Sequence, residues 1–173
     1  MNTPDHDPSR DLSFERFVDL PAEAIWAAWT QPELLMPWFC PRPWTTIACR
    51  IELRPGGEFH TVMRSPEGQE FPNSGCYLEV VPNRRLVWTN ALAPGFRPVP
   101  AGAMADFFFF TGIVTMTPQD GGTLYGARVV HGTPEDCQRH AAMGFEDGWG
   151  KALDQLIEFM RTPGRNAAPS QPG

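Results

Sequence analysis

Apolar residues alternate with polar ones along much of the chain, and in two regions the spacing changes to three or four residues. A spacing of two is typical of strands with one buried face, and a spacing of three to four is typical of amphipathic helices. Turn-forming sequences at 54–57 and 65–68 separate alternating segments and predict antiparallel hairpins. The predicted strands cover 12–20 (irregular near Arg16), 45–53, 58–64, 74–81, 85–90, 107–117 and 123–131.

A first helical region follows the first predicted strand. Pro21 suits the first turn of a helix of about ten residues, in which Ile25 and Trp29 share one face. Pro32 predicts a second, shorter helix that ends near Met36, before an aromatic-rich loop.

The end of the chain carries the strongest helical pattern. Thr133 is a suitable N-cap, so we expect one continuous helix over 133–161 with an apolar stripe about five turns long. Gly144, Gly148 and Gly150 would each cost about 1 kcal/mol relative to alanine inside such a helix. This cost has two interpretations: the helix packs closely on the sheet there, or the glycines leave room for a ligand.

The order of these elements predicts an α+β fold. A curved antiparallel sheet of about six to seven strands can bury its apolar face by wrapping around the long C-terminal helix, with two short helices after the first strand. A sheet that grips one helix tends to leave an apolar cleft at one end, and such clefts are usual sites for small molecules.

Length and charge limit the number of domains and the kinds of partner that we expect. The 173 residues suit one domain, expected over 12–161, with disordered tails over 1–11 and 162–173. The formal charge of −6 and the lack of a basic stripe argue against nucleic acid. No long apolar run or signal-peptide pattern is present, so we expect a soluble, cytoplasmic protein without membrane insertion.

The sequence has no recognisable catalytic or metal-binding motif. The four cysteines are scattered without a CxxC pair, which predicts free and mostly buried thiols. His131 and His140 lack a third ligand at a known metal spacing, and no phosphate-binding loop or GxSxG motif occurs. We therefore expect no metal and no cofactor, and the catalytic residues, if any, are unknown. The charged group at Glu52, Arg54, Glu58 and His60 is interpreted as surface salt bridges.

Several segments, taken in order, are similar to a known family. They are DLPAEAIWAAWTQPELLMPWFCPRPW, ELRPGGEF, PNRRLVWT, GGTLYGARVVH and HAAMGFEDGWGKALDQL. Over about 12–161 the chain resembles the SRPBCC or START-like superfamily, and within it the homologues of the C-terminal domain of the heat-shock protein 90 ATPase activator. The resemblance implies the helix-grip fold, a deep pocket, and relatives that include polyketide cyclases, aromatases and lipid carriers, but no single reaction. Gln31 stands where the family commonly has Asp, which predicts a weaker helix cap with only a local effect.

The aromatic residues are the main candidates for pocket walls. If Tyr125, Ala127, Val129 and His131 face the helix, His131 lies at the rim and can act as polar anchor, or as acid or base. The alternative is a structural histidine with its hydrogen bonds satisfied. The predicted ligand-binding residues are Trp38, Phe59, Met63, Tyr77, Trp88, Phe108, Phe110, Tyr125, His131, Met143, Phe145 and Trp149.

Two further segments carry expectations. Phe107 to Phe110 cannot all face one side of a strand, so one pair is expected to face the first helices or a partner subunit, which suggests a homodimer. The insertion over 91–106 is rich in Pro and Gly and is of the kind that often covers a pocket.

Three functions are compatible with these observations. The first is binding of a small hydrophobic or aromatic ligand in a cavity between the sheet and the C-terminal helix. The second is a cyclase, dehydratase or hydrolase in the same cavity, with His131 and Tyr125 in acid–base roles. The third, suggested only by the family name, is a co-chaperone or other protein-interaction module.

Overall fold

Seven strands of the chain form one antiparallel sheet in the order β1-β9-β8-β5-β4-β3-β2. The computed structural model describes residues 6–103 and 107–162. The strands are β1 (Asp11–Val18), β2 (Thr45–Ile51), β3 (Glu58–Arg64), β4 (Glu70–Val81), β5 (Arg85–Thr89), β8 (Phe110–Gln119) and β9 (Gly122–His131). The helices are α1 (Ala22–Thr30), α2 (Pro32–Leu35), α3 (Pro134–Ala142) and α4 (Phe145–Met160). The α+β class and the two short helices after the first strand are confirmed.

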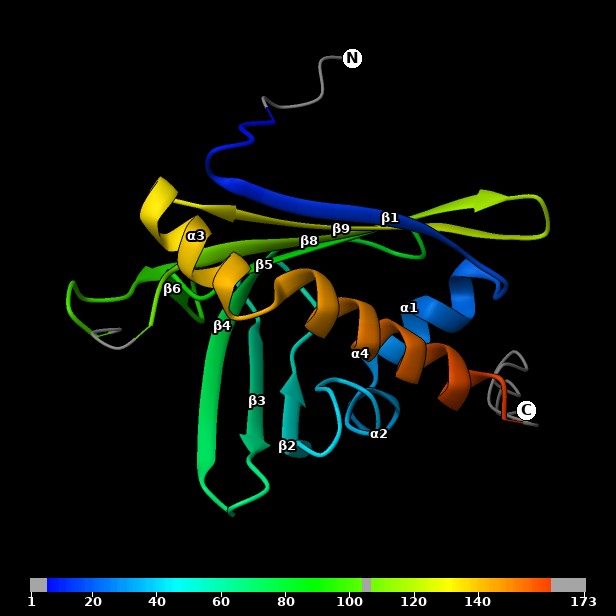
Figure 1. Cartoon of the computed structure of the whole chain (residues 1–173), viewed down its shortest axis with the longest axis horizontal. Coiled ribbons are helices and arrows are strands. Elements are labelled where there is room, and N and C mark those ends of the chain that lie inside the picture. The colour runs from blue at the N-terminus through cyan, green and yellow to red at the C-terminus, as the bar shows by residue number, and fades with distance from the viewer. Residues whose placement is uncertain (1–5, 104–106, 163–173) are drawn as a thin grey trace.

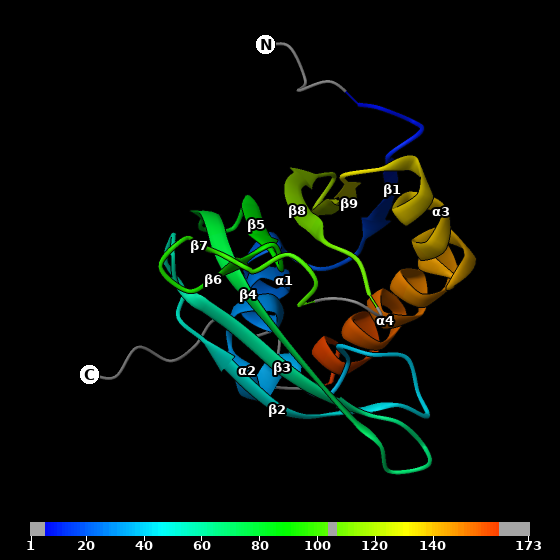
Figure 2. The ribbon, with the colours of Figure 1, turned by 90° about the vertical axis from the view of Figure 1, so that its left-hand side faces the viewer.

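The sheet is strongly curved around α4. In Figure 1, β1, β9 and β8 run along one side of the molecule while β4, β3 and β2 turn away from them, and α4 crosses the space between. Figure 2 shows the same curvature from the side. The register shifts between Thr46 and Ala48 and between Tyr77 and Glu79, and such irregularities increase the local bend and twist of a strand. The predicted helix-grip arrangement is thus confirmed.

The prediction of one continuous C-terminal helix is wrong, because the chain breaks between α3 and α4. Thr133 does cap α3, since its Oγ1 accepts a hydrogen bond from the Asp136 backbone N–H at 3.2 Å. The break is at Gly144, whose φ of +88° is a left-handed conformation that glycine adopts at little cost. Gly144 therefore lies outside the helix interior, and the helical penalty applies only to Gly148 and Gly150.

A short turn precedes the first strand. Residues 7–10 form a turn, and β1 begins at Asp11, whose buried carboxylate is bonded to the Arg128 guanidinium. The expected tails fall largely on residues 1–5 and 163–173, which lie outside the described residues.

The insertion over 91–106 contains a short hairpin. Its strands are β6 (Leu92–Ala93) and β7 (Arg97–Pro98), and residues 104–106 lie outside the described part. The following strand begins at Phe110 instead of at the predicted residue 107. Phe108 is buried, and Phe107, Phe109 and Phe110 are partly buried.

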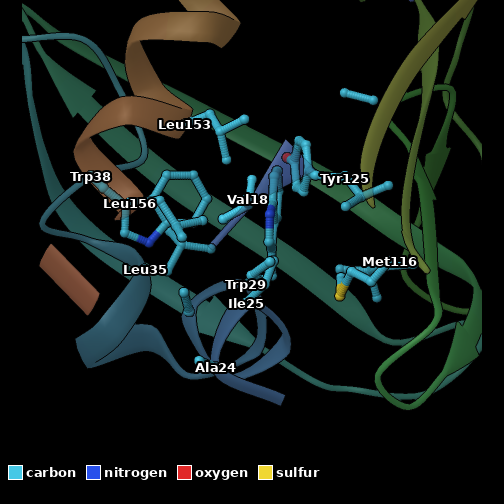
Figure 3. Packing of buried hydrophobic residues seen from close by; sticks show 14 of the residues in the cluster. Val18, Ala24, Ile25, Trp29, Leu35, Trp38, Met116, Tyr125, Leu153 and Leu156 are labelled. Atoms are coloured by element: carbon cyan, nitrogen blue, oxygen red, sulfur yellow. The ribbon is translucent and has the colours of Figure 1, made fainter. Parts of the chain in front are cut away.

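The core is built where α1 and α2 meet α4 and the sheet. Trp29 is 3% exposed and belongs to the same buried cluster as Leu153 and Leu156 of α4, which Figure 3 shows. Ile25 and Leu35 are fully buried in the same cluster. This aromatic and aliphatic core closes one end of the space under α4.

Candidate functional site

A cavity of about 630 Å³ lies between the concave face of the sheet, the helices α3 and α4, and the loop over 38–44. Its volume falls within the range of small-molecule sites. Its walls are mostly apolar and aromatic, and they also include polar side chains such as Asn90, Thr61 and His140 and the charged side chains of Arg42, Asp147 and Lys151. Nine of the twelve predicted residues line it: Trp38, Phe59, Met63, Trp88, Phe110, Tyr125, Met143, Phe145 and Trp149.

The three other predicted residues lie one layer behind the wall. Tyr77 is fully buried behind Phe59, with ring centroids 5.3 Å apart. Phe108 is buried and packs against the His140 ring at 4.9 Å. His131 is also buried, and His140 stands between it and the cavity. Tyr77, Phe108 and His131 thus do not border the cavity, because alternation identifies the inward face of a strand but not the depth of a residue.

Trp88 is held flat against the sheet by a glycine on the neighbouring strand. Gly112 of β8 pairs with Trp88 of β5, and a Cβ on Gly112 would lie 2.6 Å from the indole Cζ2. Any larger residue would push the ring out of place. The Trp88 ring also stacks on the ring of Trp149 of α4, with centroids 6.4 Å apart and an interplanar angle of 11°. One wall of the cavity therefore depends on a cross-strand pair of tryptophan and glycine.

Gln155 connects α4 to the aromatic loop and was not identified from the sequence. Its Nε2 donates to the carbonyl oxygens of Trp38 and Cys40 at 3.1 and 2.9 Å, and its Oε1 accepts from the Arg42 backbone N–H at 2.9 Å. The sequence feature that could have identified Gln155 is its position directly before Leu156, a residue of the apolar stripe of α4. These bonds place Trp38 in the wall of the cavity.

The glycines of α4 leave open space. A Cβ on Gly144, Gly148 or Gly150 would meet no atom within 4 Å. The interpretation that these glycines allow close packing of the helix on the sheet is therefore wrong. Gly144 and Gly148 border the cavity, which agrees with the alternative that they make room beside the aromatic wall.

Two buried histidines form a hydrogen-bonded pair at the α3 side of the cavity. His131 Nδ1 lies 2.8 Å from the Arg10 carbonyl oxygen, and His131 Nε2 lies 2.8 Å from His140 Nδ1. His140 is 8% exposed and packs against the rings of Phe110 and Phe145 at 5.5 and 5.4 Å. Burial, and to a smaller extent the neighbouring His131, lowers the pKa of His140 to about 4. Of the two histidines, the one that borders the cavity is thus His140, a neutral imidazole at pH 7.

This pKa predicts how stability changes with pH. Because His140 has an ordinary pKa of 6.5 when unfolded and about 4 when folded, the unfolded chain binds more protons between these values. The free energy of unfolding should therefore fall as the pH falls from 6.5 to 4, by up to about 3 kcal/mol. Denaturant titrations of the wild type and of His140→Gln at several pH values between 6.5 and 4 would measure this change in the free energy of unfolding. The same slope in both proteins would contradict the assignment to His140.

The other titratable groups near the cavity are not activated for nucleophilic chemistry. Burial raises the pKa of the Cys40 thiol. Burial also raises the pKa of the Cys49 thiol, to about 11, so both thiols remain protonated near neutral pH. Burial also raises the pKa of the Tyr125 hydroxyl. All four cysteines are free. Within residues 6–103 and 107–162, no three His, Cys, Asp or Glu side chains converge as metal ligands.

The charged group near the hairpin of β2 and β3 lies at the surface, as predicted. Arg54 pairs with Glu52 and Arg50 pairs with Glu58, each at 3.2 Å. His60 Nδ1 lies 2.7 Å from the Ser74 hydroxyl on the neighbouring strand. These residues hold the exposed side of the sheet together.

The fold and the cavity define a helix-grip domain with an aromatic-lined interior. A family model described as activator of Hsp90 ATPase homolog 1-like protein matches residues 19–161. The chain belongs to this family.

Solved structures agree with this assignment. A Nitrosomonas europaea protein is 43% identical, with a TM-score of 0.84 over 90% of this chain and 96% of that one. A Rhodobacter sphaeroides protein is 25% identical, with a TM-score of 0.75 over 90% and 95%. The AHSA1-like protein from Aeromonas hydrophila shares the fold at 21% identity, with a TM-score of 0.66 over 94% and 99%. No curated protein matches the chain. In the described part of the chain, no helix is long and apolar enough to span a membrane.

Proposed function

We propose that the protein binds a small apolar or aromatic molecule in the cavity beneath α4. The observation that carries this proposal is a space of about 630 Å³ whose walls are mostly aromatic and apolar. The wall is held in place by Gln155 and by the fit of Trp88 on Gly112, so the space is part of the fold. Preformed apolar pockets of this size favour ligands with a large apolar body and one or two polar atoms.

The mass of the freshly purified protein under native and denaturing conditions tests this directly. A reproducible additional mass in the native state would support the proposal, and its fragmentation would identify the molecule. For protein that carries no ligand, anilinonaphthalene sulfonate is a suitable fluorescent probe, because its emission increases in apolar sites. Absence of both a bound mass and saturable probe binding would contradict the proposal.

Substitution of Trp149 by alanine should weaken binding of this probe at least about tenfold, which corresponds to about 1.4 kcal/mol. The indole forms one side of the cavity through its contacts with Trp88 and with Phe145, whose ring centroid is 5.3 Å away. Glu146→Ala is the matched control, since Glu146 is exposed on the same helix and does not border the cavity. Probe titrations of both variants measure the difference, and equal dissociation constants would contradict the assignment of Trp149.

A second candidate, acid–base catalysis in the same cavity, is favoured by one observation. His140 is a neutral imidazole that borders the cavity, and a neutral imidazole can act as a general base. The molecules extracted from the wild type and from His140→Gln distinguish the two functions. Different bound species would indicate a reaction at His140, and identical species would support binding alone.

A further inference from the structure

We infer that His140 presents an unprotonated Nε2 to the cavity, so that the ligand carries a hydrogen-bond donor, such as a phenolic hydroxyl, on its apolar body. The inference rests on the proposed function, because it names the chemical class of the ligand. It follows from the order of three hydrogen-bonding groups: the Arg10 carbonyl, His131 and His140.

The chain of bonds starts at a group that can only accept. The Arg10 carbonyl oxygen lies 2.8 Å from His131 Nδ1, so this nitrogen must carry the proton. A neutral imidazole has one N–H, and the second nitrogen is then an acceptor. The Nε2 atom of His131 therefore has a free lone pair, and it points at His140 Nδ1 across 2.8 Å.

The same reasoning fixes the proton on His140. Because His131 Nε2 accepts, His140 Nδ1 must donate, and a neutral His140 then has no proton on Nε2. His140 borders the cavity, and its Nε2 has no hydrogen-bond partner among the described residues. An acceptor that faces the cavity without a protein donor is free to accept a hydrogen bond from a ligand hydroxyl.

The surroundings of His140 favour its neutral form. The His140 ring is enclosed by Phe108, Phe110 and Phe145, which cannot stabilise an imidazolium by hydrogen bonding. On α3, the Arg139 guanidinium lies 5.5 Å from the centroid of the Phe108 ring and pairs with Asp136 at 3.6 Å. On the side of β1, the Asp11 carboxylate is bonded to Arg128.

A pair of probes that differ in one hydrogen-bond donor tests the ligand class. Naphthol and its methyl ether, methoxynaphthalene, share the same apolar body, but only naphthol can donate to His140 Nε2. We expect naphthol to bind the full-length protein about five- to tenfold more tightly near neutral pH. The preference should disappear in His140→Phe and persist in His60→Gln, because His60 lies outside the cavity.

A spectroscopic measurement on the unaltered protein avoids dependence on a variant that fails to fold. Long-range ¹H–¹⁵N correlation spectra of the histidine rings distinguish protonated from unprotonated nitrogens, and His140 should show its proton on Nδ1. A proton on Nε2, or equal binding of the two probes, would overturn the inference and leave ligand binding in the cavity intact. Failure of both probes to bind would overturn the proposed function, and the ligand class with it.

Discussion

Replacement of Gly148 by phenylalanine is expected to weaken probe binding at least about tenfold without unfolding the protein. Gly148 lies on α4 and borders the cavity, and a Cβ there meets no atom within 4 Å. A phenyl group added at this position can therefore enter the space that a ligand ring would fill. Because phenylalanine is a better helix former than glycine, the free energy of unfolding should rise by about 0.5 kcal/mol.

The matched control is Gly150→Phe. A Cβ on Gly150 also meets no atom within 4 Å, but Gly150 does not border the cavity, and residues two apart on a helix face different directions. Both variants should gain the same helical stability, and only Gly148→Phe should lose binding. Titration with anilinonaphthalene sulfonate and denaturant unfolding of both proteins give the two quantities. Equal binding by the two variants would show that the ligand does not lie beside α4.

Removal of the Trp29 indole should cause the largest loss of stability, about 3–5 kcal/mol for Trp29→Ala. The side chain is 3% exposed, and its ring contacts Trp38, Trp88 and Phe39 at centroid distances of 5.0, 5.3 and 6.0 Å. The substitution would leave a cavity that these rigid rings cannot fill. A loss of this size is a large part of the stability of a typical domain.

Trp44→Ala is the control for this prediction. Trp44 is only half-buried and contacts Phe71, itself 39% exposed, with ring centroids 5.4 Å apart. Its removal should cost much less, because most of the lost contact area is already near water. Urea unfolding measured by circular dichroism compares the midpoints of the two variants with that of the wild type. Similar midpoints for Trp29→Ala and Trp44→Ala would contradict the central position of Trp29.

The elements of the fold were largely predictable because each has a local cause. Pro32 opens α2, Thr133 caps α3 through its hydroxyl, and alternation marks every strand of the main sheet. The break at Gly144 was not predicted, because the apolar stripe continues through it at helical spacing. A glycine inside such a stripe can be helical, as Gly148 is, or left-handed, as Gly144 is, and composition does not distinguish the two.

The candidate site was predictable in part, for a different reason. Periodicity showed which side chains face inward, and nine of those proposed do line the cavity. Periodicity could not show how far each side chain lies from the cavity. His131 was therefore expected at the rim, whereas the histidine that borders the cavity is His140. Gln155 was missed because its three partners are backbone groups more than one hundred residues away in the chain.

The amino-acid sequence by itself determined the class of the fold, the inward faces of the strands and the aromatic character of the interior. These properties depend on local spacing and composition, which any stretch of the chain displays. Only the tertiary structure decided that Gly148 opens into the cavity and that the Arg10 carbonyl orients a pair of histidines more than one hundred residues away. Both results depend on contacts between segments that the curved sheet brings together, and such contacts have no local signature.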